Sequence, residues 1–196
     1  MIALYGDGGH AVSIGGAVDV SLRVSDATYN SSNAGRYEWC VAIGDNQTRS
    51  RIAKKLALEG ERFTSIVAPS AVVLSSVPEG TCVLHKAVIE PGCEIGKHSI
   101  INSGAVVCHN SKIGDYTHIS PGATICGGVT IGDGVWVGAG STVKEKVRIG
   151  DGSVIGAGSV VVSDIGESVM AYGVPCRIIR GLEKVHYGTE HARRDI

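Results

Sequence analysis

The sequence predicts a mainly β protein in which a small N-terminal α/β unit precedes a three-sided coil of short parallel strands. Aliphatic residues recur every six positions through most of the chain, and the first part of the chain lacks this period. Composition agrees, because 28 glycines accompany only one Phe and two Trp among 196 residues. Few large aromatics with many small and β-branched residues indicate a thin, repetitive core.

Residues 1–62 are expected to form the α/β unit. An apolar start runs into the glycine-rich turn YGDGGH at 5–10, and a second apolar run at 39–43 leads into GDN at 44–46. Residues 51–58 then carry apolar side chains at helical spacing, and Gly60 can end that helix. The segment from His10 to Asp26 is too short for a further helix plus strand, so the predicted order is strand, turn, strand, helix.

Residues 63–165 are expected to form the coil. A six-residue period fits neither a helix nor a hairpin sheet, so each short strand must turn a corner before the next begins. A second series, two positions earlier, is mostly small, so one large and one small residue point inward on each side. About eighteen residues then make one turn, giving roughly five stacked coils. The aliphatic series runs through Ala71, Val77, Val83, Ile89, Ile95, Ile101, Val107, Ile113, Ile119, Ile125, Ile131, Val137, Val143, Ile149, Ile155 and Val161.

Residues 166–196 leave this period and are assigned to a C-terminal extension. The charge balance of 18 basic and 19 acidic residues gives no footprint for nucleic acid or an anionic membrane. The N-terminus has no export signal and no stretch is long enough to span a bilayer, so we expect a cytoplasmic protein without membrane insertion. The six cysteines form no CxxC pair and are expected to be free thiols.

Four motifs carry a resemblance to a known family: YGDGGH at 5–10, VAIGDN at 41–46, CHNSKIGDYTHISPGATICGG at 108–128 and GVPCR at 173–177. Through them nearly the whole chain resembles the sialic-acid O-acetyltransferase and bacillosamine N-acetyltransferase family. The resemblance implies a left-handed parallel β-helix of hexapeptide repeats and a homotrimer. It also implies that the first unit binds a nucleotide-sugar and that acetyl-coenzyme A binds between adjacent β-helices.

The resemblance also assigns residues to roles. His109 matches the general base, and Asn110 stands where the family usually has an acidic residue, so it can orient the ring but cannot stabilise imidazolium by charge. The amide of Gly127 matches the group that meets the thioester carbonyl. The acetyl-coenzyme A site is implied for His118, Gly127, Ala139 and Ala157, and the nucleotide-sugar site for Gly8, Gly9, His10, Asp26, Asn46 and Asn102.

The repeat register places both motif histidines outside the coil. His109 lies two positions after the inward Val107, and His118 lies one before the inward Ile119. Both are therefore expected to project outward, where a neighbouring subunit could complete a cleft. Acyl transfer needs a base, an oxyanion donor and alignment of the two reactants. The ordinary pKa of histidine is about 6.5, which suits the first role at neutral pH.

The leading hypothesis is an acetyl-coenzyme A-dependent N-acetyltransferase acting on the 4-amino group of a nucleotide-linked amino-dideoxysugar, with UDP as the expected nucleotide, in bacterial glycan biosynthesis. One alternative is an O-acetyltransferase on sialic acid or a related hydroxyl, and another is a noncatalytic trimer that binds sugar nucleotides. A zinc site like that of β-helical carbonic anhydrases is disfavoured, because the gaps between His85, His98, His109 and His118 do not fit. No metal is expected, and His85 and His98 are interpreted as structural or surface residues.

Overall fold

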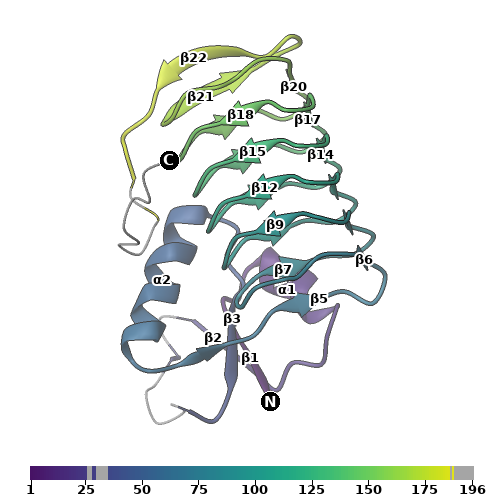
Figure 1. Cartoon of the computed structure of the whole chain (residues 1–196). Helices are drawn as coiled ribbons and strands as arrows, with labels where there is room; N and C mark the ends of the chain where they lie inside the picture. The colour runs from purple at the N-terminus through teal and green to yellow at the C-terminus, as the bar shows by residue number, and fades with distance from the viewer. Residues whose placement is uncertain (26–27, 30–34, 186, 188–196) are drawn as a thin grey trace.

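The computed structural model describes residues 1–25, 28–29, 35–185 and 187 (Figure 1). A four-stranded sheet in the order β2-β1-β3-β4 begins the chain, and all of its pairings are parallel. Its strands are β1 (Ile2–Tyr5), β2 (Leu22–Val24), β3 (Glu38–Val41) and β4 (Arg62–Phe63), and its helices are α1 (Gly9–Gly15) and α2 (Asn46–Leu58). The predicted boundary after residue 62 therefore falls inside β4.

The expectation that the segment from His10 to Asp26 is too short for a helix and a strand is wrong. Helix α1 has seven residues and β2 has three, so both fit before the chain reaches residue 25. Glycines at both ends of α1 hid it from the helical pattern. Helix α2 also begins earlier than expected, because the Asp45 side chain accepts a hydrogen bond from the Thr48 amide at 2.8 Å and caps the helix.

The remainder is a parallel β-helix with three faces, consistent with the left-handed form. Sheet I contains β5, β7, β10, β13, β16 and β19, sheet II contains β6, β8, β11, β14, β17 and β20, and sheet III contains β9, β12, β15 and β18. The strands are β5 (Ile66–Val67), β6 (Val72–Val73), β7 (Cys82–Val83), β8 (Val88–Ile89), β9 (Glu94–Ile95), β10 (Ile100–Ile101), β11 (Val106–Val107), β12 (Lys112–Ile113), β13 (His118–Ile119), β14 (Thr124–Ile125), β15 (Thr130–Ile131), β16 (Trp136–Val137), β17 (Thr142–Val143), β18 (Arg148–Ile149), β19 (Val154–Ile155) and β20 (Val160–Val161).

The coils in the middle of the β-helix advance by eighteen residues, as predicted, since Ile119 pairs with both Ile101 and Val137. The first coil is shorter than predicted, because Val73 rather than Ala71 pairs with Ile89. The six-residue series therefore does not extend unbroken to Ala71. A polar corner before β7 takes up the difference, and periodicity alone could not locate it.

The sheet also continues beyond the predicted end at residue 165. Strand β21 (Val169–Tyr172) pairs with β19 in parallel, and β22 (Arg177–Gly181) returns antiparallel to β21. These two strands lie across the last coil, at the top of the molecule in Figure 1. Strands β21 and β22 thus cover the open end of the stack, which would otherwise expose ladder groups.

The core of the β-helix is the predicted stack of Val and Ile side chains, with small residues beside them. The small inward residues that carry hydroxyls are buried and are satisfied by the backbone. The Ser99 hydroxyl donates to the Gly114 carbonyl at 2.8 Å and accepts from the Thr117 amide at 3.0 Å. Because most of these hydroxyls donate to one backbone carbonyl and accept from an amide of the next coil, the small series links neighbouring coils instead of leaving buried polar groups unpaired.

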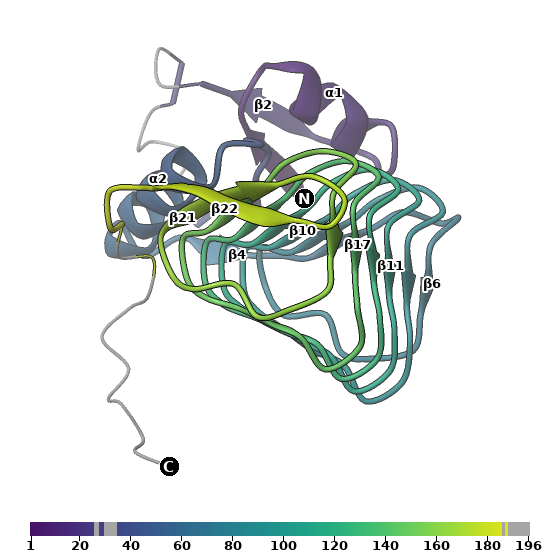
Figure 2. The same ribbon diagram turned by 90° about the horizontal axis from the view of Figure 1, so that it is seen from above.

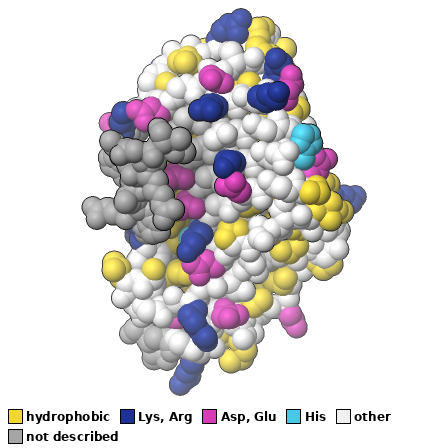
Figure 3. All heavy atoms as spheres, in the orientation of Figure 1, with side chains coloured by type: hydrophobic (Ala, Val, Ile, Leu, Met, Phe, Trp, Pro, Cys, Tyr) yellow, Lys and Arg dark blue, Asp and Glu magenta, His cyan; other side chains and the backbone are white. Residues whose placement is uncertain are grey.

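The three outer faces differ in character. Sheet I is packed against the N-terminal unit, with Leu4 and Cys40 in one apolar cluster with Ile66 and Cys82. Sheet III presents Glu94, Lys112, Thr130 and Arg148, and the face shown in Figure 3 carries basic and acidic side chains together. Sheet II presents Val72, Val88, Val106, Thr124, Thr142 and Val160.

Sheet II is therefore the largely apolar face, and its strands lie on the side away from α2 (Figure 2). Within the described part of the chain, no helix has the length and apolar character needed to cross a membrane.

Candidate active site

His118 lies on the outer side of sheet I and is buried, because the N-terminal unit covers it. Its Nδ1 lies 3.2 Å from the Gly44 carbonyl oxygen, and its Nε2 lies 3.0 Å from Nδ2 of Asn102. Its ring stacks on Trp136 with centroids 5.6 Å apart, and the His10 ring meets it edge-on at 5.6 Å. His118 is therefore outward, as predicted, but its own chain covers part of it.

The partners of His118 fix its protonation. A carbonyl oxygen only accepts, so Nδ1 must carry the proton. Asn102 Oδ1 accepts from the Ser103 amide at 2.7 Å, which turns Nδ2 toward His118 Nε2 as a donor. Burial, assisted by the charge of Arg49, lowers the pKa of His118 to about 3. His118 is thus a neutral ring with both nitrogens hydrogen-bonded.

An apolar groove of about 450 Å³ runs along sheet I toward its corner with sheet II. His118 and Trp136 form one part of its wall, and Ala139 and Ala157 stand at two successive corners of the coil. The Trp136 indole donates to the Ser120 hydroxyl at 2.8 Å, which fixes the ring. Three of the residues predicted for acetyl-coenzyme A, namely His118, Ala139 and Ala157, therefore line one groove.

His109 and Gly127 lie at a different corner, between sheets II and III. His109 is exposed, and its ring lies over Gly127: a Cβ at Gly127 would come within 2.6 Å of Cε1 and 2.7 Å of Nε2. The His109 backbone is held by its amide, which donates to Glu90 Oε2 at 2.7 Å. Among the described residues the Gly127 amide has no hydrogen-bond partner, so it can donate to a ligand.

Asn110 contacts the His109 ring. Its Nδ2 lies 3.4 Å from His109 Nδ1, and its backbone is in the left-handed region at φ 58°, which Asn tolerates. An amide nitrogen facing Nδ1 favours the tautomer with the proton on Nε2. For Nε2 to accept a proton, the amide must turn so that its oxygen faces Nδ1.

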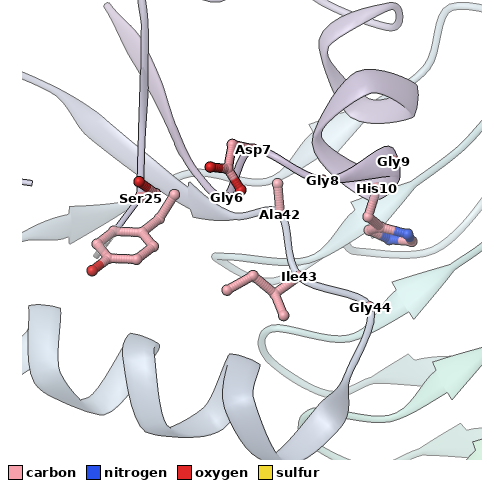
Figure 4. Close-up of a pocket in the computed structure, with 10 residues that line it drawn as sticks. Gly6, Asp7, Gly8, Gly9, His10, Ser25, Ala42, Ile43 and Gly44 are labelled. Atoms are coloured by element: carbon pink, nitrogen blue, oxygen red, sulfur yellow. The ribbon is translucent and has the colours of Figure 1, made fainter. Parts of the chain in front are cut away.

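A cavity of about 380 Å³ lies at the carboxyl ends of β1 and β3 in the N-terminal unit (Figure 4). Gly8, Gly9 and His10 line it, together with Gly44 from the turn after β3. The Nε2 of His10 is buried and has no partner among the described residues, and burial lowers the pKa of His10 to about 4. Three of the six predicted nucleotide-sugar residues thus meet in one cavity, at the strand ends where parallel α/β sheets bind ligands.

Asn46 and Asn102 lie outside this cavity. Asn46 is buried, and its Nδ2 donates to the carbonyls of Gly134 and Val135 at 3.0 and 3.1 Å, so it joins α2 to the β-helix. Asn102 faces His118 and not the cavity. Asp26 lies outside the described residues.

Sequence reasoning missed Trp136 and Arg49. The outward position of Trp136, eighteen residues after His118 in the same sheet, was a usable signal. Arg49 had none, because only the packing of α2 against the coil makes it part of the site. Among the described residues, no three His, Cys, Asp or Glu side chains converge in a way that could hold a metal ion.

The family described as bacterial transferase hexapeptide (six repeats) matches residues 95–127 and 128–163. None of the curated proteins compared with the chain matches it.

Solved structures match almost the whole chain. A mutant of perosamine N-acetyltransferase from Caulobacter crescentus, in complex with CoA and GDP-perosamine, is 31% identical with a TM-score of 0.86, over 91% of this chain and 96% of that one. The acetyltransferase domain of PglB from Neisseria gonorrhoeae FA1090, in complex with acetyl coenzyme A, is 25% identical with a TM-score of 0.85, over 91% and 98%. WeeI from Acinetobacter baumannii AYE, at 22% identity and a TM-score of 0.73 over 91% and 99%, shares the fold.

Proposed function

Because the chain belongs to the hexapeptide-repeat acyltransferases, we propose that it is an acetyl-coenzyme A-dependent N-acetyltransferase acting on the 4-amino group of a nucleotide-linked amino-dideoxysugar in bacterial glycan biosynthesis. The neighbouring structures that contain CoA with GDP-perosamine, or acetyl coenzyme A, support this class of reaction. UDP remains our expected nucleotide from the sequence resemblance, and GDP is the nucleotide in one neighbour, so both belong in the assay.

One observation carries the assignment of the base. Both nitrogens of His118 are already hydrogen-bonded and its pKa is strongly lowered, so it cannot take a proton from the acceptor. His109 is exposed and lies over Gly127, whose amide is available. We assign the general base to His109, the oxyanion donor to Gly127, and a wall of the acyl groove to His118 with Trp136.

The step that follows is a direct transfer. The amine nitrogen attacks the thioester carbonyl carbon while His109 Nε2 takes the amine proton, and the resulting oxyanion accepts a hydrogen bond from the Gly127 amide. Collapse forms the amide and expels the coenzyme A thiolate, which takes the proton back from His109. Asn110 supports this only in the orientation where its carbonyl oxygen accepts from Nδ1–H.

A homotrimer would bring the two halves of the site together. His109 and Gly127 stand along one edge of sheet II, whereas Ala139 and Ala157 stand along the other edge. In a head-to-tail ring of copies packed through sheet II, one edge of sheet II in each copy lies beside the opposite edge of sheet II in the next copy. The aliphatic outer residues of sheet II suit burial in such a ring, unlike the charged residues of sheet III.

The decisive assay measures coenzyme A release with UDP- and GDP-linked 4-amino-dideoxysugars and with sialic acid as the hydroxyl acceptor. We expect turnover with an amino sugar, and His109→Ala to lower kcat on the order of a hundredfold or more while acetyl-coenzyme A still binds. Turnover only with the hydroxyl acceptor would contradict the proposed N-acetyltransferase activity and indicate an O-acetyltransferase. Sugar-nucleotide binding with no turnover on any acceptor would indicate a noncatalytic trimer.

A further inference from the structure

Arg49 is a fully buried cation at the junction of α2 and the β-helix, with 1% of its surface exposed. Its guanidinium reaches the turn after β3, the start of α2 and two corners of the coil. The acceptors are the Ile43 carbonyl at 2.8 Å, the Gly44 carbonyl at 3.0 Å, the Asn46 Oδ1 at 2.6 Å, the His98 carbonyl at 2.8 Å and the Tyr116 carbonyl at 2.7 Å.

No carboxylate pairs with Arg49 within the described ranges, and burial lowers its pKa to about 10, so it remains a cation at neutral pH. A buried charge whose hydrogen bonds all go to neutral acceptors is costly, and an apolar side chain of similar size avoids that cost. The planar guanidinium group, with its forked set of N–H donors, can fix the direction of several carbonyl groups at once, which an apolar side chain cannot do.

One of those carbonyls belongs to the site. The Gly44 oxygen accepts from Arg49 Nη1 at 3.0 Å and from His118 Nδ1 at 3.2 Å, so both of its lone pairs are used. Gly44 also lines the N-terminal cavity, and His118 lines the apolar groove. Gly44 therefore lies between the two candidate ligand sites, and Arg49 fixes its carbonyl group by a hydrogen bond.

The electrostatics act in the same direction as the geometry. After burial, the charge of Arg49 is the next cause that lowers the pKa of both His118 and His10. A guanidinium behind Gly44 thus disfavours a second positive charge on either ring. The Asn102 amide supplies the remaining hydrogen bond, to His118 Nε2, that only a neutral ring can accept.

We propose that Arg49 is a positioning residue that, through the Gly44 carbonyl, holds His118 as the neutral tautomer protonated at Nδ1 and so shapes the acyl-coenzyme A groove. The role rests on the proposed function for the identity of the ligand. Loss of the fork frees the Gly44 carbonyl to turn, which lets His118 rotate off Trp136 or exchange its proton between nitrogens.

The first test reads the tautomer in the intact protein. Nitrogen-15 NMR of labelled histidine, assigned with His118→Gln, is expected to show His118 neutral and protonated at Nδ1 in the wild type at pH 6. In Arg49→Lys, which keeps the charge but loses the fork, we expect a mixture of tautomers or a protonated ring. A wild-type His118 protonated at Nε2 or charged at pH 6 overturns the proposal without any variant.

The second test reads the groove. In a Trp39→Phe background Trp136 is the only tryptophan, so quenching of its fluorescence by coenzyme A reports occupancy of the groove. We expect Arg49→Lys to raise the Kd for coenzyme A about tenfold. The matched control is Leu56→Ala, which removes a buried contact of the same helix without touching Gly44 and lowers the melting temperature without changing the Kd or the tautomer.

The outcomes separate this inference from the proposed function. If the wild type does not bind coenzyme A, the proposed function fails, and the NMR result still decides the role of Arg49. If the wild type binds coenzyme A, and Arg49→Lys keeps both the Kd and the tautomer while losing only thermal stability, Arg49 is a structural residue and the inference is overturned.

Discussion

At the scale of single residues, the two motif histidines are chemically unlike. His118 is buried between Gly44, Asn102 and Trp136, and every polar atom of its ring is occupied. His109 is exposed, and its ring contacts a glycine and an asparagine. The same residue type therefore lines a groove on sheet I and serves as a candidate base at a corner of the coil, because burial decides whether an imidazole can exchange protons.

Replacing Asn110 by Asp tests how the His109 ring is oriented. A carboxylate can only accept from Nδ1–H, so Asn110→Asp is expected to leave Nε2 as the acceptor and raise kcat roughly two- to tenfold. Asn110→Ala is the control and should lower kcat. Steady-state kinetics with the best acceptor measure both; equal kcat values for the two variants would show that Asn110 does not act through the ring.

Gly127 is expected to be intolerant of any side chain for a local reason. A Cβ there would come within 2.6 Å of the His109 ring, so Gly127→Ala displaces the imidazole and should lower kcat at least about tenfold. The melting temperature should stay close to that of the wild type, because His109 is exposed and can move. Gly166→Ala, where a Cβ meets nothing within 4 Å, is the matched control; the idea fails if the two variants have the same kcat.

At the scale of elements, the junction between the N-terminal unit and the β-helix is built on neutral histidines. Burial lowers the pKa of His98 to about 4, as it does for His10, and that of His118 to about 3. His98 stacks on Tyr116 at 5.2 Å and meets Phe63 edge-on at 4.6 Å. The interpretation of His98 as a structural residue agrees with this setting.

These lowered pKa values predict acid sensitivity of the junction. The unfolded chain binds a proton at each of these histidines near pH 6.5, whereas the folded chain binds it only near pH 4 or below. The free energy of unfolding therefore has its full value above about pH 6.5 and decreases as the pH falls from there to about 4. Thermal melts from pH 7.5 to 4.5 should show a falling midpoint.

The variant His98→Asn provides the control for that prediction. Asn tolerates the left-handed backbone at this position, where φ is 54°, and does not titrate. Its melting temperature should be lower at pH 7.5, since ring stacking is lost, but its dependence on pH should be shallower. A slope equal to that of the wild type would remove His98 from the explanation.

At the scale of the whole molecule, the candidate site is divided between two edges of sheet II. One edge supplies His109 and Gly127, and the other supplies Ala139, Ala157 and the Trp136 groove. The three faces of the coil keep these edges apart in one chain, since the coil core lies between them. A complete site therefore requires a second copy if the proposed function is correct.

Complementation between inactive variants tests the shared site. His109→Ala removes the base from one edge, and Ala139→Trp fills the groove at the other, so each homomeric variant should be inactive. Co-expressed chains that mix at random should regain activity in about a quarter of their sites, where both wild-type edges meet. Separately purified variants combined only in the assay are the control. Hybrids that stay inactive, although mass spectrometry shows both chains in one trimer, would place the whole site within one chain.

The sequence by itself determined the β-helix, its eighteen-residue coil and the outward direction of both histidines, because a period of six is a translational property that every coil repeats. It did not reveal the short elements α1 and β2 or the shortened first coil near Ala71, since a few glycines or a shortened corner leave no periodic signal. The family resemblance assigned Gly8, Gly9 and His10 to the nucleotide-sugar site, and in the structure these three residues line one cavity.

Only the tertiary structure decided which histidine has both ring nitrogens hydrogen-bonded and which residues lie between the N-terminal cavity and the apolar groove. Gly44 meets His118 across 74 positions, and Arg49 and Asn46 contact the coil across still different separations. Such contacts depend on how one unit packs on another, and packing follows from the shapes of complete surfaces instead of from spacing along the chain. For that reason the repeat could predict where side chains point, whereas burial and hydrogen bonding decided what they can do.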